Sequence, residues 1–120
     1  MDHRQHPRVQ ATPPAKAHFK VGEQIHHAIP IANIGISGCC LHSSMPLADL
    51  LAGHPLLEDW QLKGPGLPAK SIRARVIWVG QSDGPSGSDF RAGIQFQDAP
   101  VGYTNLVFRY VTMRSHSISG

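Results

Sequence analysis

Hydrophobic and polar residues alternate along most of the chain, a pattern that predicts β-strands with one buried face. The alternation is clearest late in the sequence, over residues 72–78 and 90–96. A segment rich in Gly and Ser, residues 80–88, separates the two strands, so we predict a hairpin with a loose tip. Ile77 and Val79 make both faces apolar near the end of the first strand, which predicts that this end is covered on both sides.

Earlier segments predict four more strands. Residues 15–21 alternate regularly, and residues 24–32 form the return strand, where Pro30 removes one backbone donor and predicts irregular pairing. Two shorter strands are predicted at residues 39–43 and 56–63. In the latter, the interrupted alternation places Leu56, Trp60 and Leu62 on the inner face.

Two segments have helical spacing instead. Leu47, Leu50 and Leu51 fit one helical turn that Gly53 ends. The C-terminal segment predicts an amphipathic helix with Asp98 as a cap, and its inner face comprises Tyr103, Leu106, Val107, Tyr110 and Val111.

These elements define a mainly β fold, a small antiparallel barrel closed to protect its strand edges, with the helix flanking one end. A chain of 120 residues is long enough for one such core. Residues 1–14 lack hydrophobic periodicity and are predicted to be a flexible arm. We assign residues 15–114 to the barrel and helix, and residues 115–120 to a tail.

The formal net charge of +3 mildly favours anionic partners but falls short of the basic stripe of a nucleic-acid binder. Aromatic residues make up 7% of the chain and mostly occupy apolar faces, which argues against a surface that stacks single-stranded nucleic acid. No apolar run approaches the roughly 20 residues that cross a bilayer, so we expect no direct membrane insertion.

The titratable residues do not form a catalytic or metal-binding pattern. The eight histidines have no recurring ligand spacing, and adjacent His26 and His27 point apart on a strand. Cys39 and Cys40 are also adjacent and are predicted to be thiols, which, with a polar start that lacks a signal peptide, favours the cytoplasm. We therefore expect neither an enzyme, a metal site nor a cofactor.

The arm carries the most informative pair of charges. Arg4 and Arg8 are four residues apart, a separation that puts both on one side of a strand or a helix. Pro7 favours the extended form, in which the two side chains begin roughly 13 Å apart. Guanidinium groups match phosphate oxygens and guanine edges, so the pair suits a ligand with two anionic groups, although a solvated basic arm is the simpler alternative.

Three features in this order resemble the PilZ domains, a family of bacterial receptors for cyclic di-GMP. Arg4-x-x-x-Arg8 matches the RxxxR segment of the family, and the corner from Asn33 to Gly38 matches its (D/N)xSxxG segment. The hairpin of residues 74–79 and 91–96 is similar to the late hairpin of these domains. Gly35 departs from the family pattern, which usually has Ser at this position.

The resemblance implies a six-stranded split barrel with a C-terminal helix, and cyclic di-GMP as its ligand. Arg4 and Arg8 would contact phosphates and guanine faces, while Asn33, Gly35 and Gly38 would contribute from the barrel surface. We include His3, Gln5 and Arg91 in the same ligand-binding set. Binding would order the arm, which would then contact a downstream effector protein or a fused domain. The alternative is a PilZ-fold adaptor that binds no nucleotide and acts by protein contact alone, and ordinary turn chemistry also accounts for Asn33 and Gly38.

Overall fold

The computed structural model describes residues 8–10, 15–43, 46–47, 51, 53, 55–84 and 87–119. Seven strands and one long helix are the main elements of this part of the chain. In chain order they are β1 (Arg8–Gln10), β2 (Lys16–Val21), β3 (Gln24–Gly35), β4 (Gly38–Ser43), β5 (Leu56–Lys63), β6 (Ile72–Gly84), β7 (Gly87–Gln97) and α2 (Val101–Ser119).

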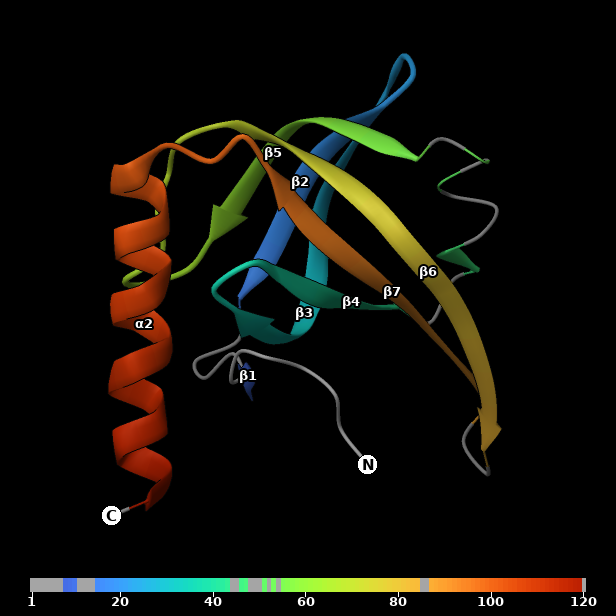
Figure 1. The fold of residues 1–120 in the computed structure, drawn as a ribbon. Coiled ribbons are helices and arrows are strands. Elements are labelled where there is room, and N and C mark those ends of the chain that lie inside the picture. Colours follow the sequence, from blue (N-terminus) through green and yellow to red (C-terminus); the bar gives the residue numbers. More distant parts are fainter. Residues whose placement is uncertain are drawn as a thin grey trace.

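Strands β2 to β7 form a closed antiparallel barrel (Figure 1). Neighbouring strands pair in the order β3, β2, β5, β6, β7, β4, and β4 pairs again with β3 to complete the ring. Strand β1 adds to β3 outside this ring. The predicted six-stranded barrel with a C-terminal helix is therefore confirmed.

The inner faces of the strands supply the core, as the alternation predicts. Trp60 has no exposed surface and stacks on Phe19, with ring centroids 5.6 Å apart. Helix α2 lies beside the barrel (Figure 1) and contacts β1 and β3. Its buried face comprises Tyr103, Val107, Tyr110 and Val111. Leu106, predicted to lie on that face, is 44% exposed, so this prediction is wrong.

Strand β3 changes partners along its length, which explains its irregular pairing. Its first half pairs with β2, and its second half pairs with β4 on one side and β1 on the other. Between the pairs Ala17–Ile29 and Phe19–His26 the register shifts by one residue, and Ala28 takes a positive φ of 58°. The predicted irregularity is confirmed, and it falls at this bulge.

A second bulge reverses the predicted faces at the start of β5, whereas Trp60 and Leu62 are buried as predicted. The register shifts between Leu57 and Trp60, and Asp59 has a φ of 49°. Leu57 is consequently fully buried, whereas Leu56 is 47% exposed. The prediction that Leu56 faces the core is wrong because the bulge inserts one residue into the alternation.

The β6–β7 hairpin is longer and more open than predicted. Its ladder continues to the pair Gly84–Gly87, so most of the expected loop is strand. Ile77, Trp78 and Val79 are 53%, 48% and 41% exposed, contrary to the prediction of cover on both sides. The reason is that β5 begins opposite Arg75, so the hairpin continues beyond its neighbouring strand.

The helix boundaries also differ from the prediction. Asp98 has a φ of 51° and precedes the helix, while the carbonyl oxygen of Pro100 accepts the first turn's hydrogen bond from the amide of Thr104 at 3.0 Å. Asp98 therefore does not cap α2. The helix continues to Ser119, so most of the predicted tail is helical.

Two further predictions fall partly outside the described residues. Within the short turn predicted around Leu47, both Leu47 and Leu51 are helical and buried, and Leu50 is outside the described part. Within the predicted flexible arm, Arg8–Gln10 form strand β1 instead. The remaining arm residues are not described.

Candidate functional site

The pairing of β1 with β3 brings the two sequence motifs together. Arg8 lies opposite Gly35 in this ladder, and Gln10 lies opposite Asn33. The second arginine of the first motif is thus next to the second motif, although the segments are distant in the sequence. His3, Arg4 and Gln5 lie outside the described residues, so their positions stay predictions.

The same level of the barrel continues across three more strands. Asn33 pairs with Cys40, Cys40 with Gly93, and Gly93 with Trp78. Neighbours such as Ile34 and Ile94 are fully buried, so strand alternation turns this row toward the outside of the barrel. We call it the outer row; it comprises Asn33, Cys40, Gly93 and Trp78, of which Cys40 is buried.

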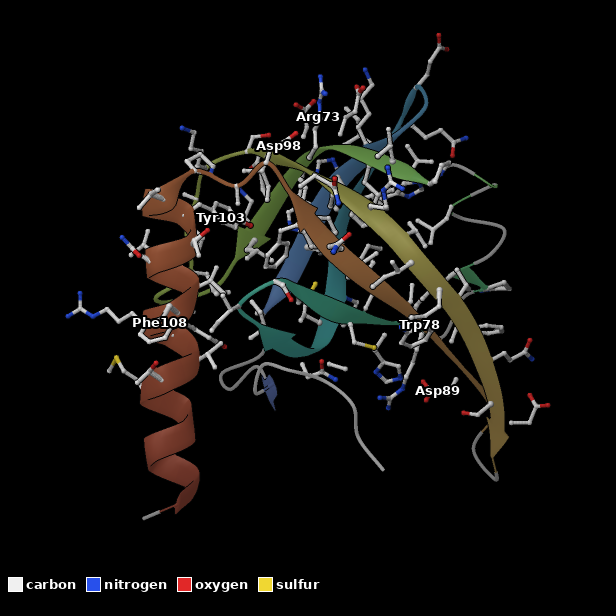
Figure 2. All side chains as sticks on the ribbon, in the orientation of Figure 1. Arg73, Trp78, Asp89, Asp98, Tyr103 and Phe108 are labelled. Atoms are coloured by element: carbon white, nitrogen blue, oxygen red, sulfur yellow. The ribbon has the colours of Figure 1, made fainter. Side chains whose placement is uncertain are left out.

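Trp78 ends the outer row with an exposed aromatic ring. A Cβ atom added at Gly93 would overlap the indole Nε1 of Trp78 and lie 2.6 Å from its Cδ1. The indole therefore covers Gly93, while the side chain remains 48% exposed (Figure 2). Alternation places Trp78 on the same strand face as Ile72 and Ala74, which are buried, so its exposure does not follow from the sequence pattern.

The two motif glycines have different structural roles. Neither Gly35 nor Gly38 is among the described residues with positive φ. A Cβ atom at Gly38 would overlap the carbonyl oxygen of Ile94, so glycine is required there by the close approach of β7. The adjacent corner is also held by a 2.9 Å hydrogen bond from the amide of Phe96 to the carbonyl of Ser37. Gly38 is thus explained by packing, and the backbone of Gly35 imposes no left-handed constraint.

Arg91 lies on the outer surface near this row and is held by an acid. It is two residues before Gly93 on β7 and pairs with His42 of β4. The guanidinium Nε donates to Asp89 Oδ2 at 3.1 Å, and His42 pairs with the other carboxylate oxygen. Partial desolvation opposes ionisation of Asp89, but the Arg91 hydrogen bond and the His42 charge lower its pKa overall. The carboxylate therefore partly neutralises the cation that the sequence assigned to the ligand.

A pocket lies elsewhere on the barrel. It has a volume of about 450 Å³, and Figure 2 shows two of its lining residues, Arg73 and Asp98, away from Trp78. Arg73 is in the first pair of the β6–β7 ladder, whereas Trp78 is near the middle of that ladder. Glu58 and Asp59 also line it, so acids outnumber the single arginine. This pocket does not suit an anionic ligand.

Within the described part of the chain, no three His, Cys, Asp or Glu side chains gather close enough to hold a metal ion together. Cys39 and Cys40 are both buried thiols, as predicted. Among the helices of the described residues, none combines the length and apolar character needed to span a membrane.

The packed core and the outer row define a β-barrel module whose candidate binding surface is on the outside of the barrel. The family model of the PilZ domain matches residues 2–113. The chain belongs to the PilZ domain family. No curated protein matches the sequence.

Solved structures share this fold. The PilZ domain of YcgR from Escherichia coli, solved with c-di-GMP, has a TM-score of 0.77 and 11% identity, covering 98% of this chain and 95% of that one. The K. pneumonia MrkH–c-di-GMP complex has a TM-score of 0.83 and 16% identity, covering 99% of this chain and 55% of that one. The Bacillus subtilis inhibitor of motility, MotI/DgrA, has a TM-score of 0.70 and 16% identity, covering 98% and 53% respectively. This chain thus spans about half of the last two proteins.

Proposed function

We propose that this chain is a receptor for cyclic di-GMP and that the ligand lies against the outer row. The observation that carries the proposal is the β1–β3 register, in which Arg8 lies opposite Gly35 and two positions along the ladder from the Gln10–Asn33 pair. The fold is shared with structures of YcgR and MrkH that contain c-di-GMP, which supports the same ligand class here.

Each part of this surface has chemistry that suits one part of the ligand. The guanidinium groups of Arg4 and Arg8 would bind phosphate oxygens and guanine edges, for which their planar donor arrays are suited. The side-chain amide of Asn33 would hydrogen-bond a guanine. Trp78 adds an exposed indole at the far end of the same row, where a guanine would stack.

The output of the receptor would be a protein contact. Helix α2 contacts both β1 and β3, the two strands that carry the motifs. A ligand that binds the docked arm more tightly than the undocked arm shifts the population toward the docked state. The arm and the adjacent helix surface would then present a changed surface to an effector protein or a fused domain.

An adaptor that binds no nucleotide is the second candidate. Two observations favour it: Gly35 lacks the hydroxyl usual in this motif, and Asp89 partly neutralises Arg91. A direct binding measurement separates the two candidates.

Calorimetric titration of the chain with cyclic di-GMP is the decisive experiment, with GTP as the control for general nucleotide affinity. The receptor proposal expects saturable binding of cyclic di-GMP and much weaker binding of GTP. Absence of heat and of NMR shift changes at millimolar cyclic di-GMP would overturn it in favour of the adaptor.

A further inference from the structure

Two histidines meet on the outer face of the β2–β3 hairpin, away from the outer row. The Nδ1 atoms of His18 and His27 are 2.6 Å apart, and their ring centroids are 4.1 Å apart at an interplanar angle of 66°. Both rings reach the surface: His18 is half-buried and His27 is exposed. The residues are nine positions apart in sequence, so only the hairpin brings them together.

The bulge in β3 creates this contact. His18 lies opposite the shift in register, where the extra residue Ala28 takes positive φ. His26, one position earlier, turns the other way and contacts the buried ring of Phe19, with centroids 5.7 Å apart. The adjacent histidines therefore point apart, as predicted, and only His27 reaches His18.

The geometry of the pair is close to what a metal ion needs. One of the two facing nitrogens carries the proton that the other accepts, and a metal ion that displaces this proton would meet two nitrogen ligands. A metal at about 2.05 Å from each nitrogen, with a right angle between the bonds, would separate them by about 2.9 Å. The nitrogens would have to move apart by about 0.3 Å, and the rings would have to turn so that both lone pairs meet at the metal.

We propose that His18 and His27 form a two-histidine binding site for a divalent transition-metal ion, with Cu²⁺ bound most tightly. Imidazole is a good ligand for copper, nickel and zinc, and copper has the highest affinity for a given nitrogen site in this series. Within the described residues no third His, Cys, Asp or Glu joins the pair, so water completes the coordination and the ion exchanges readily. The site goes beyond the nucleotide-binding proposal and does not depend on it.

Nearby charges are on balance unfavourable for a cation. On β5, Lys63 and Asp59 act on His18 with opposite sign, and the effect of Lys63 is the larger. Lys16 and Lys20 lie on the same strand as His18 and lower the affinity for any cation. Solvent exposure weakens these contributions, so they set the strength of the site and not its chemistry.

Copper titration of the full-length chain tests the proposal. A free amino terminus followed by a histidine at the third position chelates Cu²⁺ by itself, so every titration uses a His3→Ala background. In this background we expect one Cu²⁺ per chain with imidazole nitrogens in its electron paramagnetic resonance spectrum. His18→Gln and His27→Gln should each weaken copper binding at least about tenfold. Even the loss of a residue that only hydrogen-bonds to a metal ligand lowers metal affinity about 10- to 100-fold.

His26→Gln is the matched control, because this residue is adjacent in sequence but faces Phe19. Copper binding should be unchanged in this variant. The proposal is overturned if His18→Gln and His27→Gln bind copper as the background does. If a variant unfolds, the test is paramagnetic broadening of the NMR signals of the chain in which His18 and His27 are both unchanged. Selective loss of the His18 and His27 ring signals at low copper supports the site. Broadening only at other residues overturns it.

Discussion

The β6–β7 ladder differs in shape and in charge between its end at Arg73 and its middle at Trp78. At the end, Arg73 and Asp98 line a pocket in which acids predominate, and a pocket is where a small ligand would ordinarily be sought. In the middle, Trp78 lies on the outer surface of the barrel (Figure 2). For a dianion such as the proposed ligand, arginine and an aromatic ring are more favourable than an acidic hollow.

The largest expected effect is at the arginine beside the second motif. Arg8→Ala should weaken cyclic di-GMP binding more than tenfold, since each charged hydrogen bond lost is worth about 1.5 to 3 kcal/mol. Arg8→Lys should not restore it, because an ammonium lacks the planar donor pair. Arg73→Ala, in the acidic pocket, is the control and should bind normally by calorimetry. If Arg73→Ala loses binding and Arg8→Ala does not, the ligand binds in the acidic pocket and the proposed site is wrong.

Trp78 is the next test of the outer surface. Trp78→Ala should cost about 1 to 3 kcal/mol of binding free energy if a guanine stacks on the indole. Trp78→Phe should retain part of that affinity, because an aromatic face remains. Fluorescence titration of the unaltered chain should detect quenching of Trp78, with buried Trp60 as the constant background. Equal affinity in Trp78→Ala and the unaltered chain would remove the ring from the site.

A smaller gain is expected at Gly35. Its φ is not in the left-handed region, so a side chain there carries no backbone penalty of that kind. Gly35→Ser should therefore tighten cyclic di-GMP binding by about 0.5 to 1.5 kcal/mol through one added hydrogen bond. The thermal midpoint, measured in parallel, should hardly change. A variant of unchanged stability that binds no tighter would show that the absent hydroxyl does not limit affinity.

The smallest effect concerns the acid that holds Arg91. Asp89→Asn should tighten cyclic di-GMP binding a few-fold at most, since an exposed ion pair is weak. The pKa of Asp89 is lower in the folded chain than in the unfolded chain, where it is near 4. The ionised carboxylate therefore adds to the free energy of unfolding above about pH 4, and this contribution disappears as the pH falls through the folded-state pKa. Denaturant unfolding of both chains should therefore differ at neutral pH and converge in acid. A difference that stays the same from neutral pH into acid would contradict this assignment.

Much of the barrel follows from alternation alone, because strands with one buried face have a period of two. The predicted buried and exposed faces are wrong where a bulge inserts one residue. Ala28 and Asp59 have positive φ at these bulges, and nothing in the sequence marks either of these non-glycine residues. Exposure of Trp78 likewise depends on where β5 begins, which is a property of the tertiary pairing.

In the candidate site, too, part of the arrangement follows from local sequence patterns and part depends on tertiary pairing. The sequence contains both motifs, but their proximity arises from three residues of β1 that pair with β3, inside a segment predicted to be flexible. The His18–His27 contact depends on a bulge and was missed for the same reason. Local patterns predict which residues form strands, and only the register decides which side chains meet.

The three-residue length of β1 sets the scale of its docking equilibrium. Ordering the backbone of three residues costs about 3 to 6 kcal/mol, at roughly 1 to 2 kcal/mol per residue. A net hydrogen bond contributes about 0.5 to 1.5 kcal/mol, so three would return about 1.5 to 4.5 kcal/mol. The two amounts are close, so in the proposed receptor β1 would be near the threshold at which a ligand worth a few kcal/mol determines whether the strand is attached. A longer β1 would remain paired with β3 with or without ligand. The pairing at this edge of β3 would then no longer change when the ligand binds.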